Sequence, residues 1–339
     1  MSTTGQVKTF SDLYGDLTNR IRAQSGSSGP IDVMKRYINM ALQDIHIGAK
    51  ERMPWAERQS VLVTQPNYTT GTVSISQGSA TLTGTSTAWN TNNAWSVKNA
   101  RKYGKMVLDG GLENYEVSAV GSDTSITLAS QFTQATLTDA TYEYFEDEYD
   151  LAADFLRPVD FRFFDLNRSM TIMPRNEFRA SYVRQQTPGK PTAVTLIDRP
   201  PSGNVTPVRR VLFNRPTDAA YTIPYSYVTR YLVVTSAGVA QEEFSSDTDE
   251  PIIPLPYRHI IVAKALYWAY RDRRNDTRAD AANQEFVDLW LRIANDNEYG
   301  GSRPSFSPGV SGYMNRAKRP MSGGTPRVTS GTAFDELRE

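Results

Sequence analysis

The stretch from Pro256 to Tyr299 constrains the fold more than any other part of the chain. Nearly every residue between Ile260 and Tyr270 is apolar, so a helix there would be hydrophobic on all sides, as in a helix buried inside a domain. A second, amphipathic helix is predicted to begin at Asp276 or Thr277, because either side chain can cap its first turn. We call these two helices the helical hub. Its predicted packing residues are Ile261, Ala265, Trp268, Phe286 and Trp290.

Two further helices are predicted at the N-terminus, where they can cover the helical hub. Apolar residues recur every three or four positions from Phe10 to Ile21, and again from Ile31 to Ile45. A run rich in Ser and Gly at residues 25–30 separates the two segments and ends the first helix. Residues 1–60 and 251–299 are therefore predicted to form one helical domain between them.

The hydrophobic period changes to two after Val61, which indicates β-strands. Residues 72–76 and 80–83 alternate and flank Gln77-Gly78-Ser79, so they predict a hairpin with a glycine turn. Further short strands are predicted at residues 105–108, 115–120, 125–128 and 141–145. Even spacing with turn signals is typical of a small antiparallel barrel or sandwich, so residues 61–146 are predicted to form an inserted β-module.

A second β-rich region is predicted for residues 147–250, with residues 146–158 as a linker into it. Its short candidate strands include residues 180–183, and the clearest one runs from Tyr225 to Val234. Many prolines lie between the candidates, which favours edge strands and loops over long central strands. The predicted fold class is α+β: a helical-bundle domain with inserted antiparallel β-barrel or sandwich modules and an extended C-terminal tail, residues 300–339.

Composition excludes most reaction chemistry. The chain has 339 residues, no cysteine and two histidines, His46 and His259, so disulfides, thiolate metal sites and cysteine nucleophiles are ruled out. Formal charge is zero, with 37 basic and 37 acidic residues, so the chain as a whole would not attract nucleic acid. The first residues lack a secretory signal, and no run of about eighteen apolar residues occurs. We expect a protein of a cytoplasm, or of an assembly made there, with no membrane partner.

An acidic cluster is the strongest candidate for chemistry: Glu143, Glu146, Asp147, Glu148, Asp150 and Asp154. Such residues could hold a hard cation or supply the carboxylate pair of a glycosidase, but a solvated linker or a salt-bridging hinge is the commoner role of an acidic run. His259 is expected to be a structural residue, and His46 is placed on the exposed side of its helix. We therefore predict no enzyme activity, no catalytic residue, no cofactor and no metal.

The tail from residue 300 to 339 shows no periodicity and is rich in Gly, Pro, Ser and Arg. Its basic and aromatic residues could contact nucleic acid, dock on an acidic protein surface, or only keep the chain soluble. Protein docking is the favoured interpretation. The predicted contact residues are Arg303, Phe306, Tyr313, Met314, Arg316, Lys318, Arg319 and Arg327.

Several segments resemble a known family. Phe10-Ser11-Asp12-Leu13, the run from Tyr37 to Ile45 and Pro54-Trp55-Ala56-Glu57-Arg58 resemble the head-to-tail adaptor proteins of tailed bacteriophages, which are also called connector or head-completion proteins. The run from Gly78 to Trp89 is similar to a β-module that recurs in phage structural proteins. The run from Phe145 to Phe155 resembles the segment that returns from that module. Together with the helical hub, the resemblance covers most of the chain.

The resemblance implies a ring, usually of twelve subunits, bound beneath the portal at the virion neck. It implies a helical domain, projecting β-parts, and a C-terminal tail that reaches up along portal subunits. The expected partners are other copies of the chain, the portal protein, tail or nozzle proteins, and genomic DNA that passes through the channel. Unlike the smallest adaptors, this chain has a second proline-rich β-region, at roughly residues 160–250, whose role the resemblance does not supply.

Two alternatives stay open. The chain could be a carbohydrate-binding or carbohydrate-cleaving tail component that uses the acidic cluster and exposed aromatic residues such as Trp89 and Trp95. It could also be a tail-tube or tail-terminator protein, which would form a six-fold ring beneath a tube.

Overall fold

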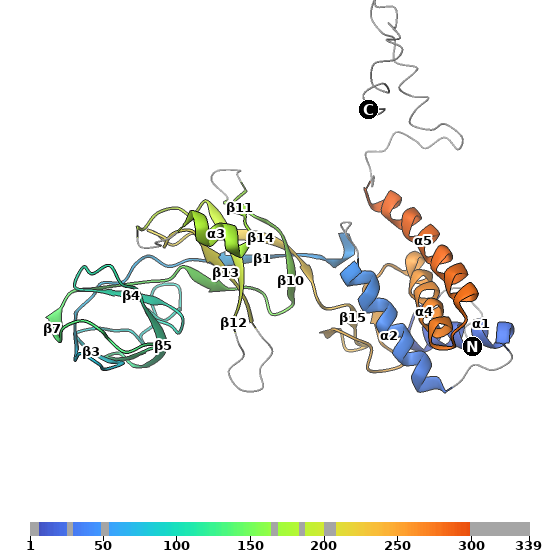
Figure 1. The fold of residues 1–339 in the computed structure, drawn as a ribbon, viewed down its shortest axis with the longest axis horizontal. Helices are drawn as coiled ribbons and strands as arrows, with labels where there is room; N and C mark the ends of the chain where they lie inside the picture. The colour runs from blue at the N-terminus through green and yellow to red at the C-terminus, as the bar shows by residue number, and fades with distance from the viewer. Residues whose placement is uncertain are drawn as a thin grey trace, which may run out of the picture. The chain divides into compact units, whose positions relative to one another are not determined.

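The computed structural model describes residues 7–25, 30–48, 54–163, 169–182, 187–199 and 208–298. Within them the chain is a mixed α and β protein with five α-helices and four sheets (Figure 1). Every pair of neighbouring strands is antiparallel except β11 with β12. No helix in the described part of the chain combines the length and the apolar character needed to cross a membrane.

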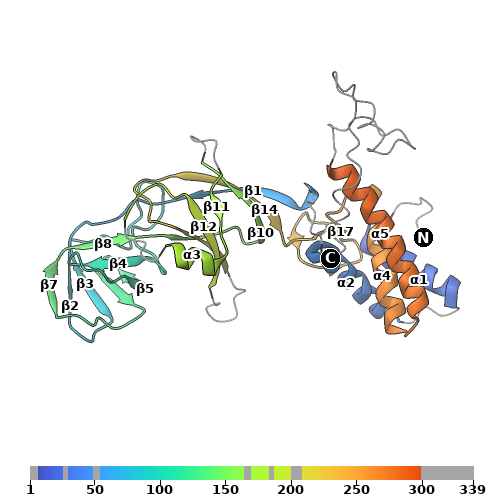
Figure 2. The same cartoon turned by 45° about the horizontal axis from the view of Figure 1, so that its top comes forward.

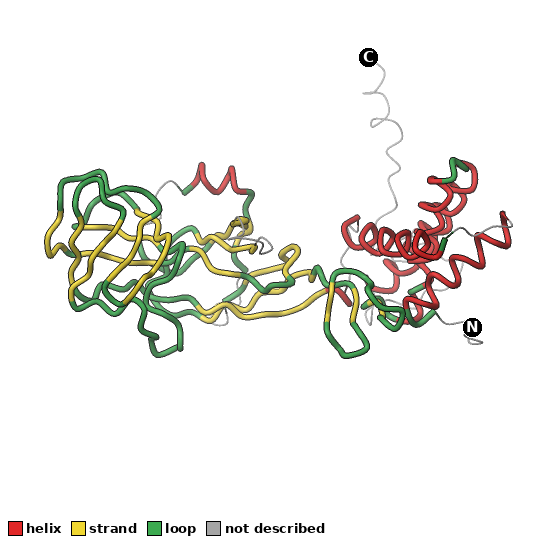
Figure 3. The backbone as a smooth tube through the Cα atoms, turned by 90° about the horizontal axis from the view of Figure 1, so that it is seen from below, coloured by secondary structure: helices red, strands yellow, loops and turns green. Residues whose placement is uncertain are grey.

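Three helices pack against one another: α1 (Phe10–Ser25), α2 (Ile31–Gly48) and α4 (His259–Asp272). Figure 3 shows these helices in red. The apolar face of α1 is buried, and α4 is buried over most of its surface, as its sequence predicts. Two hydrogen bonds also join α2 to α4: the Tyr37 hydroxyl donates to Asp272 at 2.5 Å, and the Trp268 indole donates to Asp44 at 2.8 Å. The two N-terminal helices and the apolar α4 are therefore confirmed as helices in mutual contact.

Helix α5 (Asp276–Glu298) begins at the predicted position but is capped by another residue. The side-chain oxygen of Asn275 accepts a hydrogen bond from the backbone N–H of Arg278 at 3.3 Å. Asn275 is therefore the cap, not Asp276 or Thr277, and an amide oxygen serves this position as well as a carboxylate does.

A three-stranded sheet has the order β1-β14-β10 and links distant parts of the sequence. Its strands are β1 (Glu57–Val63), β14 (Thr222–Thr229) and β10 (Phe155–Phe161).

Two predictions about these strands are corrected by the structure. Residues 155–161 form a strand where a linker was predicted, and the predicted strand 225–234 is divided. Its last residues form β15 (Val233–Val234), which pairs with β16 (Ala240–Gln241) and β17 (Glu250–Pro251).

The two edges of the three-stranded sheet differ. Strand β10 carries Pro158 and two register irregularities, features that discourage another strand from pairing with it. Strand β1 pairs with β14 in continuous register and has neither feature. Just beyond β1, the Thr64 N–H donates to the Tyr221 carbonyl at 2.9 Å. In an antiparallel pair every second residue bonds to the partner strand. The peptide groups of Ser60 therefore bond to β14, and those of Val61 point away from it.

This alternation predicts opposite tolerance to proline at adjacent positions. Ser60→Pro removes an N–H that bonds to β14, whereas Val61→Pro removes an N–H that faces away from it. We expect Ser60→Pro to lower the free energy of unfolding by about 2 kcal/mol more than Val61→Pro does. Urea denaturation of both variants measures the difference. Equal losses would show that our assignment of the outer edge is wrong.

The inserted β-module is a seven-stranded sheet of order β7-β2-β3-β6-β5-β4-β8 (Figure 2). Its strands are β2 (Thr72–Ile75), β3 (Thr81–Thr85), β4 (Lys105–Leu108), β5 (Tyr115–Ser122), β6 (Ser125–Leu128), β7 (Leu137–Ala140) and β8 (Tyr142–Phe145). Strands β7 and β8 lie at opposite edges, yet only Thr141 separates them in sequence. The sheet must therefore curl, so that the end of β7 comes close to the start of β8, around an apolar core that contains Trp89, Phe132 and Tyr144.

The predicted hairpin of this sheet is confirmed. Strands β2 and β3 pair in antiparallel register across the turn at Gln77-Gly78-Ser79. Gly78 has φ of +79°, a conformation that glycine adopts without the steric cost of a side chain. The turn residue and the alternation on either side of it were sufficient to place the hairpin.

The second β-rich region contains a four-stranded sheet of order β11-β12-β13-β9. Its strands are β9 (Glu148–Asp150), β11 (Thr171–Ile172), β12 (Ala193–Arg199) and β13 (Val208–Phe213). The predicted strand at residues 180–183 is wrong, because residues 175–181 form helix α3 (Arg175–Ser181). This helix follows Pro174 and buries only Phe178, so it is too short to show a helical period in the sequence.

Candidate functional site

The predicted contact residues of the tail, Arg303 to Arg327, lie outside the described residues. The hub residues fall within them. Ile261 and Ala265 are buried in α4, and Trp268 is half-buried. In α5 the rings of Phe286 and Trp290 stack at 6.1 Å, and Trp290 packs against the buried Ala56 and Val228. Packing contacts therefore explain why these five hub positions are apolar.

The acidic cluster forms an extensive polar arrangement in which three of the six residues are buried, whereas Asp150 is exposed. Glu146, Asp147 and Glu148 are 4, 0 and 6% exposed. Glu146 and Asp147 lie between β8 of the seven-stranded sheet and β9 of the four-stranded sheet, and Glu148 is the first residue of β9, so the chain passes here from one core to the next. The middle of the run is therefore not solvated, whereas the expected salt bridges are present. Buried carboxylates require compensating partners, and basic residues distant in sequence supply them.

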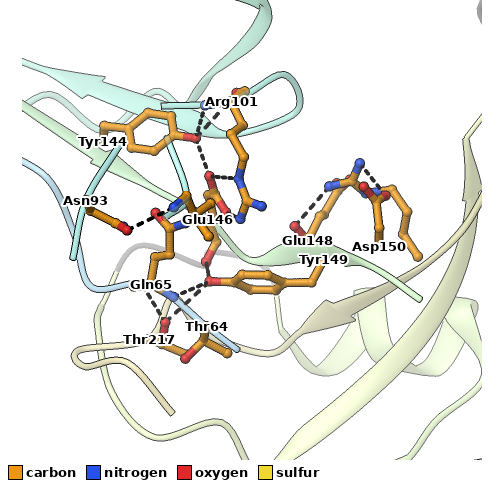
Figure 4. A network of polar contacts seen from close by, with 12 residues as sticks. Thr64, Gln65, Asn93, Arg101, Tyr144, Glu146, Glu148, Tyr149, Asp150 and Thr217 are labelled. Atoms are coloured by element: carbon orange, nitrogen blue, oxygen red, sulfur yellow. Dashed lines mark hydrogen bonds and ion pairs between the residues drawn. The ribbon is translucent and has the colours of Figure 1, made fainter. Parts of the chain in front are cut away.

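Glu146 is held by Arg101 and Tyr144 (Figure 4). The Arg101 guanidinium bonds to both carboxylate oxygens, with its Nε at 3.0 Å, and the Tyr144 hydroxyl donates at 2.6 Å. The Arg101 backbone N–H donates in turn to the same hydroxyl at 2.8 Å. Burial, together with the Glu146 charge, raises the pKa of Tyr144 well above its ordinary value, so the phenol stays protonated and remains a donor.

Asp147 is fully buried and pairs with Lys105 at 2.5 Å. Burial raises the pKa of the Asp147 carboxyl to about 6, and the Lys105 ammonium offsets only part of that rise. The backbone carbonyl of Asp147 accepts a hydrogen bond from the Phe213 N–H at 2.8 Å, which extends the contact to β13. The other carboxylate oxygen of Asp147 has no hydrogen-bond partner among the described residues.

Glu148 completes the arrangement by binding two arginines of the four-stranded sheet. Arg199 of β12 bonds to it at 2.6 Å and also reaches Glu116 of β5 at 2.9 Å. Arg210 of β13 lies 3.8 Å from Glu148. Both guanidinium groups lie over the ring of Tyr103, at 4.5 and 4.8 Å from its centroid. We call this whole set of charges the ionic junction, because it joins the seven-stranded sheet to the four-stranded sheet.

The ionic junction is arranged to hold structure. A glycosidase needs one carboxyl group that can donate a proton and another that can reach substrate, but Glu146 and Glu148 are both buried and bound to arginine. The described residues contain no group of three or more His, Asp or Glu side chains placed to hold a metal ion. The sequence did not reveal the basic partners, because single Arg and Lys residues in predicted strands carry no spacing signal.

His46 is also placed differently from expectation. It lies near the end of α2 and is buried, not exposed, and its Nε2 donates to the backbone carbonyl of Thr229 at 2.6 Å. Burial lowers the pKa of His46 below its ordinary value, the charge of Arg157 lowers it further, and the hydrogen bond opposes both. The neutral imidazole thus connects α2 to the end of β14.

This placement predicts a pH-dependent contribution to stability. The lowered pKa means that His46 contributes stability above about pH 6.5, and this contribution is lost as the pH falls and the folded state must accept a proton. We expect His46→Gln to reduce the loss of melting temperature between pH 7 and pH 5. His259 stays in both proteins, so the difference reports on His46. An unchanged pH profile would contradict the assignment.

The two tryptophans proposed as exposed aromatic residues have different surroundings. Trp89 is fully buried, and its indole N–H donates to the Tyr142 hydroxyl at 3.0 Å, so that expectation is wrong. Trp95 is 49% exposed, which agrees with the expectation. The sequence could not separate them, because both lie in one loop rich in Asn and Thr.

No protein-family model matches the chain, and no curated protein is significantly similar to it.

Proposed function

We propose that this chain is a structural protein of a tailed-phage virion, a head-to-tail adaptor. It forms a ring, of twelve subunits, under the portal at the virion neck, where it joins the DNA-filled head to the tail and lines the DNA exit channel. The protein is not an enzyme in this proposal. It is made in the host cytoplasm and gains its function by assembly.

The observation that carries the proposal is the contact of α1 and α2 with α4. All the β-strands lie between these helices in the sequence, so the chain leaves a set of packed helices, forms its sheets, and returns. This order matches the helical domain with projecting β-parts that the resemblance implies. The polar residues of the ionic junction are neutralised within the chain, which favours a structural role over a catalytic one.

The finer architecture is part of the proposal. Residues 1–60 and 251–299 would form one helical bundle, residues 61–146 and 147–250 would be β-insertions, and residues 300–339 would be the tail that binds the portal. The balanced total charge suits a channel through which DNA passes without being held. The β-insertions would face outward or toward tail and nozzle proteins.

Electron microscopy of the purified chain mixed with the portal protein of the same phage tests the proposal. We expect a closed ring of twelve copies on one face of the portal. A chain that forms neither a ring nor a complex with the portal would contradict it. A six-fold ring at the end of a tail tube would instead support the tail-terminator alternative.

A further inference from the structure

Strand β1 has an unpaired outer edge that is three residues long. Its peptide groups alternate in direction, so those of Gln59, Val61 and Val63 point away from β14. Within the described part of the chain, no strand lies beside this edge and no group bonds to these three residues on that side. An unpaired edge of this kind is a template for another extended chain.

Side chains close both ends of this open edge. At one end the Arg58 guanidinium donates to the Glu57 carbonyl at 2.9 Å. At the other end lies Gln65, the next residue whose peptide groups point outward by the same alternation (Figure 4). Its N–H donates to the Tyr149 hydroxyl at 3.1 Å, and its carbonyl accepts from the Thr217 hydroxyl at 2.7 Å. The open edge is therefore limited to three residues and is symmetric about the middle one.

The side chains of the same three residues all lie on one face of the sheet, and this face is exposed. Val61 and Val63 are 54 and 42% exposed, whereas Leu62, on the other face, is buried. Two valines that neighbour each other on an exposed face gain stability when further apolar side chains cover them. An extended partner with valines at matching positions would supply both the backbone hydrogen bonds and this cover.

A second copy of β1 is such a partner. A two-fold axis at Val61 places the two copies of that residue opposite each other, and it places Gln59 of each copy opposite Val63 of the other. This is the one antiparallel register of β1 with itself in which each free residue bonds to another free residue. The four valines of the two copies then meet on one face.

The opposite edge of the same sheet limits the assembly to two copies. Strand β10 carries Pro158 and two register irregularities, which discourage another strand from pairing there. Each chain can therefore add one partner at β1 and none at β10. Pairing at β1 ends with a closed dimer and does not continue into a fibre.

We propose that β1 is a self-association site, at which two copies of the chain pair their open edges antiparallel about Val61. The inference does not rest on the adaptor function. Neighbours in a cyclic ring meet through two different patches, whereas a two-fold contact uses the same patch on both copies. The dimer is thus a state of chains outside a ring. Because the contact is small, the dimer is weak and reversible.

Disulfide trapping tests the register, because the chain has no cysteine and an introduced thiol is the only one present. Opposite residues of a hydrogen-bonded antiparallel pair have Cα atoms about 5.5 Å apart, which a disulfide can span. In a glutathione buffer, we expect full-length Val61→Cys to form a covalent dimer about tenfold faster, or more, than Val63→Cys does. The two positions share residue type, strand, face and similar exposure, but only the copies of Val61 would lie opposite each other.

A mixture of two variants gives a second test of the same register. Gln59→Cys and Val63→Cys chains, mixed in equal amounts, should link to each other faster than either links to itself, because these two positions face each other across the axis. Mass spectrometry separates the mixed dimer from the two symmetric ones. Equal trapping of Val61→Cys and Val63→Cys would overturn the proposal, since a different strand or a random collision would then explain the contact.

Val61→Pro supplies a test without a covalent bond. The substitution removes the outward N–H and leaves the bonds to β14 in place, so the variant should fold. Sedimentation of the full chain up to about 500 µM should show a monomer–dimer equilibrium for the wild type and only monomer for Val61→Pro. A wild-type chain that stays monomeric over this range, or a folded Val61→Pro chain that dimerises as the wild type does, would also overturn the proposal. If melting shows that the variant is unfolded, the trapping rates decide alone.

Discussion

Replacement of Glu148 by glutamine is expected to lower the free energy of unfolding by about 3 kcal/mol. The carboxylate is 6% exposed and is bound by Arg199, with Arg210 near it, so its loss leaves these two guanidinium groups with only the more exposed Glu116 and Asp150 as acidic partners. A glutamine of the same shape keeps the packing, so the change isolates the charge. Urea denaturation at pH 7, analysed for both the midpoint and the slope, measures the effect.

Asp198→Asn supplies the matched control for this prediction. Asp198 pairs with Arg209 at 2.8 Å between β12 and β13, the strands that carry Arg199 and Arg210, but both side chains of that pair are exposed to solvent. Such a pair contributes about 0 to 1 kcal/mol. If Glu148→Gln costs no more than Asp198→Asn, the ionic junction is screened by water and does not stabilise the contact between the sheets.

Removal of residues 299–339 is expected to abolish portal binding and to leave the rest of the protein folded. The tail carries the predicted contacts, so we expect the dissociation constant for the portal to rise by about a hundredfold or more. The buried residues of the described chain all lie at or before Ile293, so the melting temperature should stay unchanged. Calorimetric titration with the portal and thermal denaturation measure the two effects.

A second variant keeps the tail and removes only charge. Replacement of Arg316, Lys318 and Arg319 together by alanine should weaken portal binding less than truncation does, because the aromatic residues predicted to contact the portal stay in place. Full affinity in the truncated chain would mean that the portal contacts lie elsewhere, and the role proposed for the tail would then be wrong.

The elements that the sequence predicted correctly are those with strong local signals. The apolar run of α4 and the hairpin at Gly78 depend on residues close together in the chain, so period and turn chemistry were sufficient. Helix α3 and strand β10 were missed for a physical reason. Helix α3 has a single buried residue, and β10 contains a proline and two irregularities, so neither shows a regular period.

The acidic cluster shows why the site could not be predicted from sequence. The charge of buried Glu146 is compensated by Arg101, and that of Glu148 by Arg199. These arginines lie on a loop and a strand that only the fold brings next to the acidic run. An acidic run alone does not show whether it is solvated or paired with basic residues, so the sequence left both environments open. The same limitation explains His46, whose partner Thr229 lies on a strand far away in the chain.

The single residue between β7 and β8 also bears on how the module folds. Once β7 has paired with β2, the chain has only Thr141 with which to reach β4 on the far side, so β8 cannot also pair with β4 while the sheet is flat. The strands between the two edges must therefore curl before both pairings can exist together. During synthesis, the module would stay incomplete until Phe145 has left the ribosome.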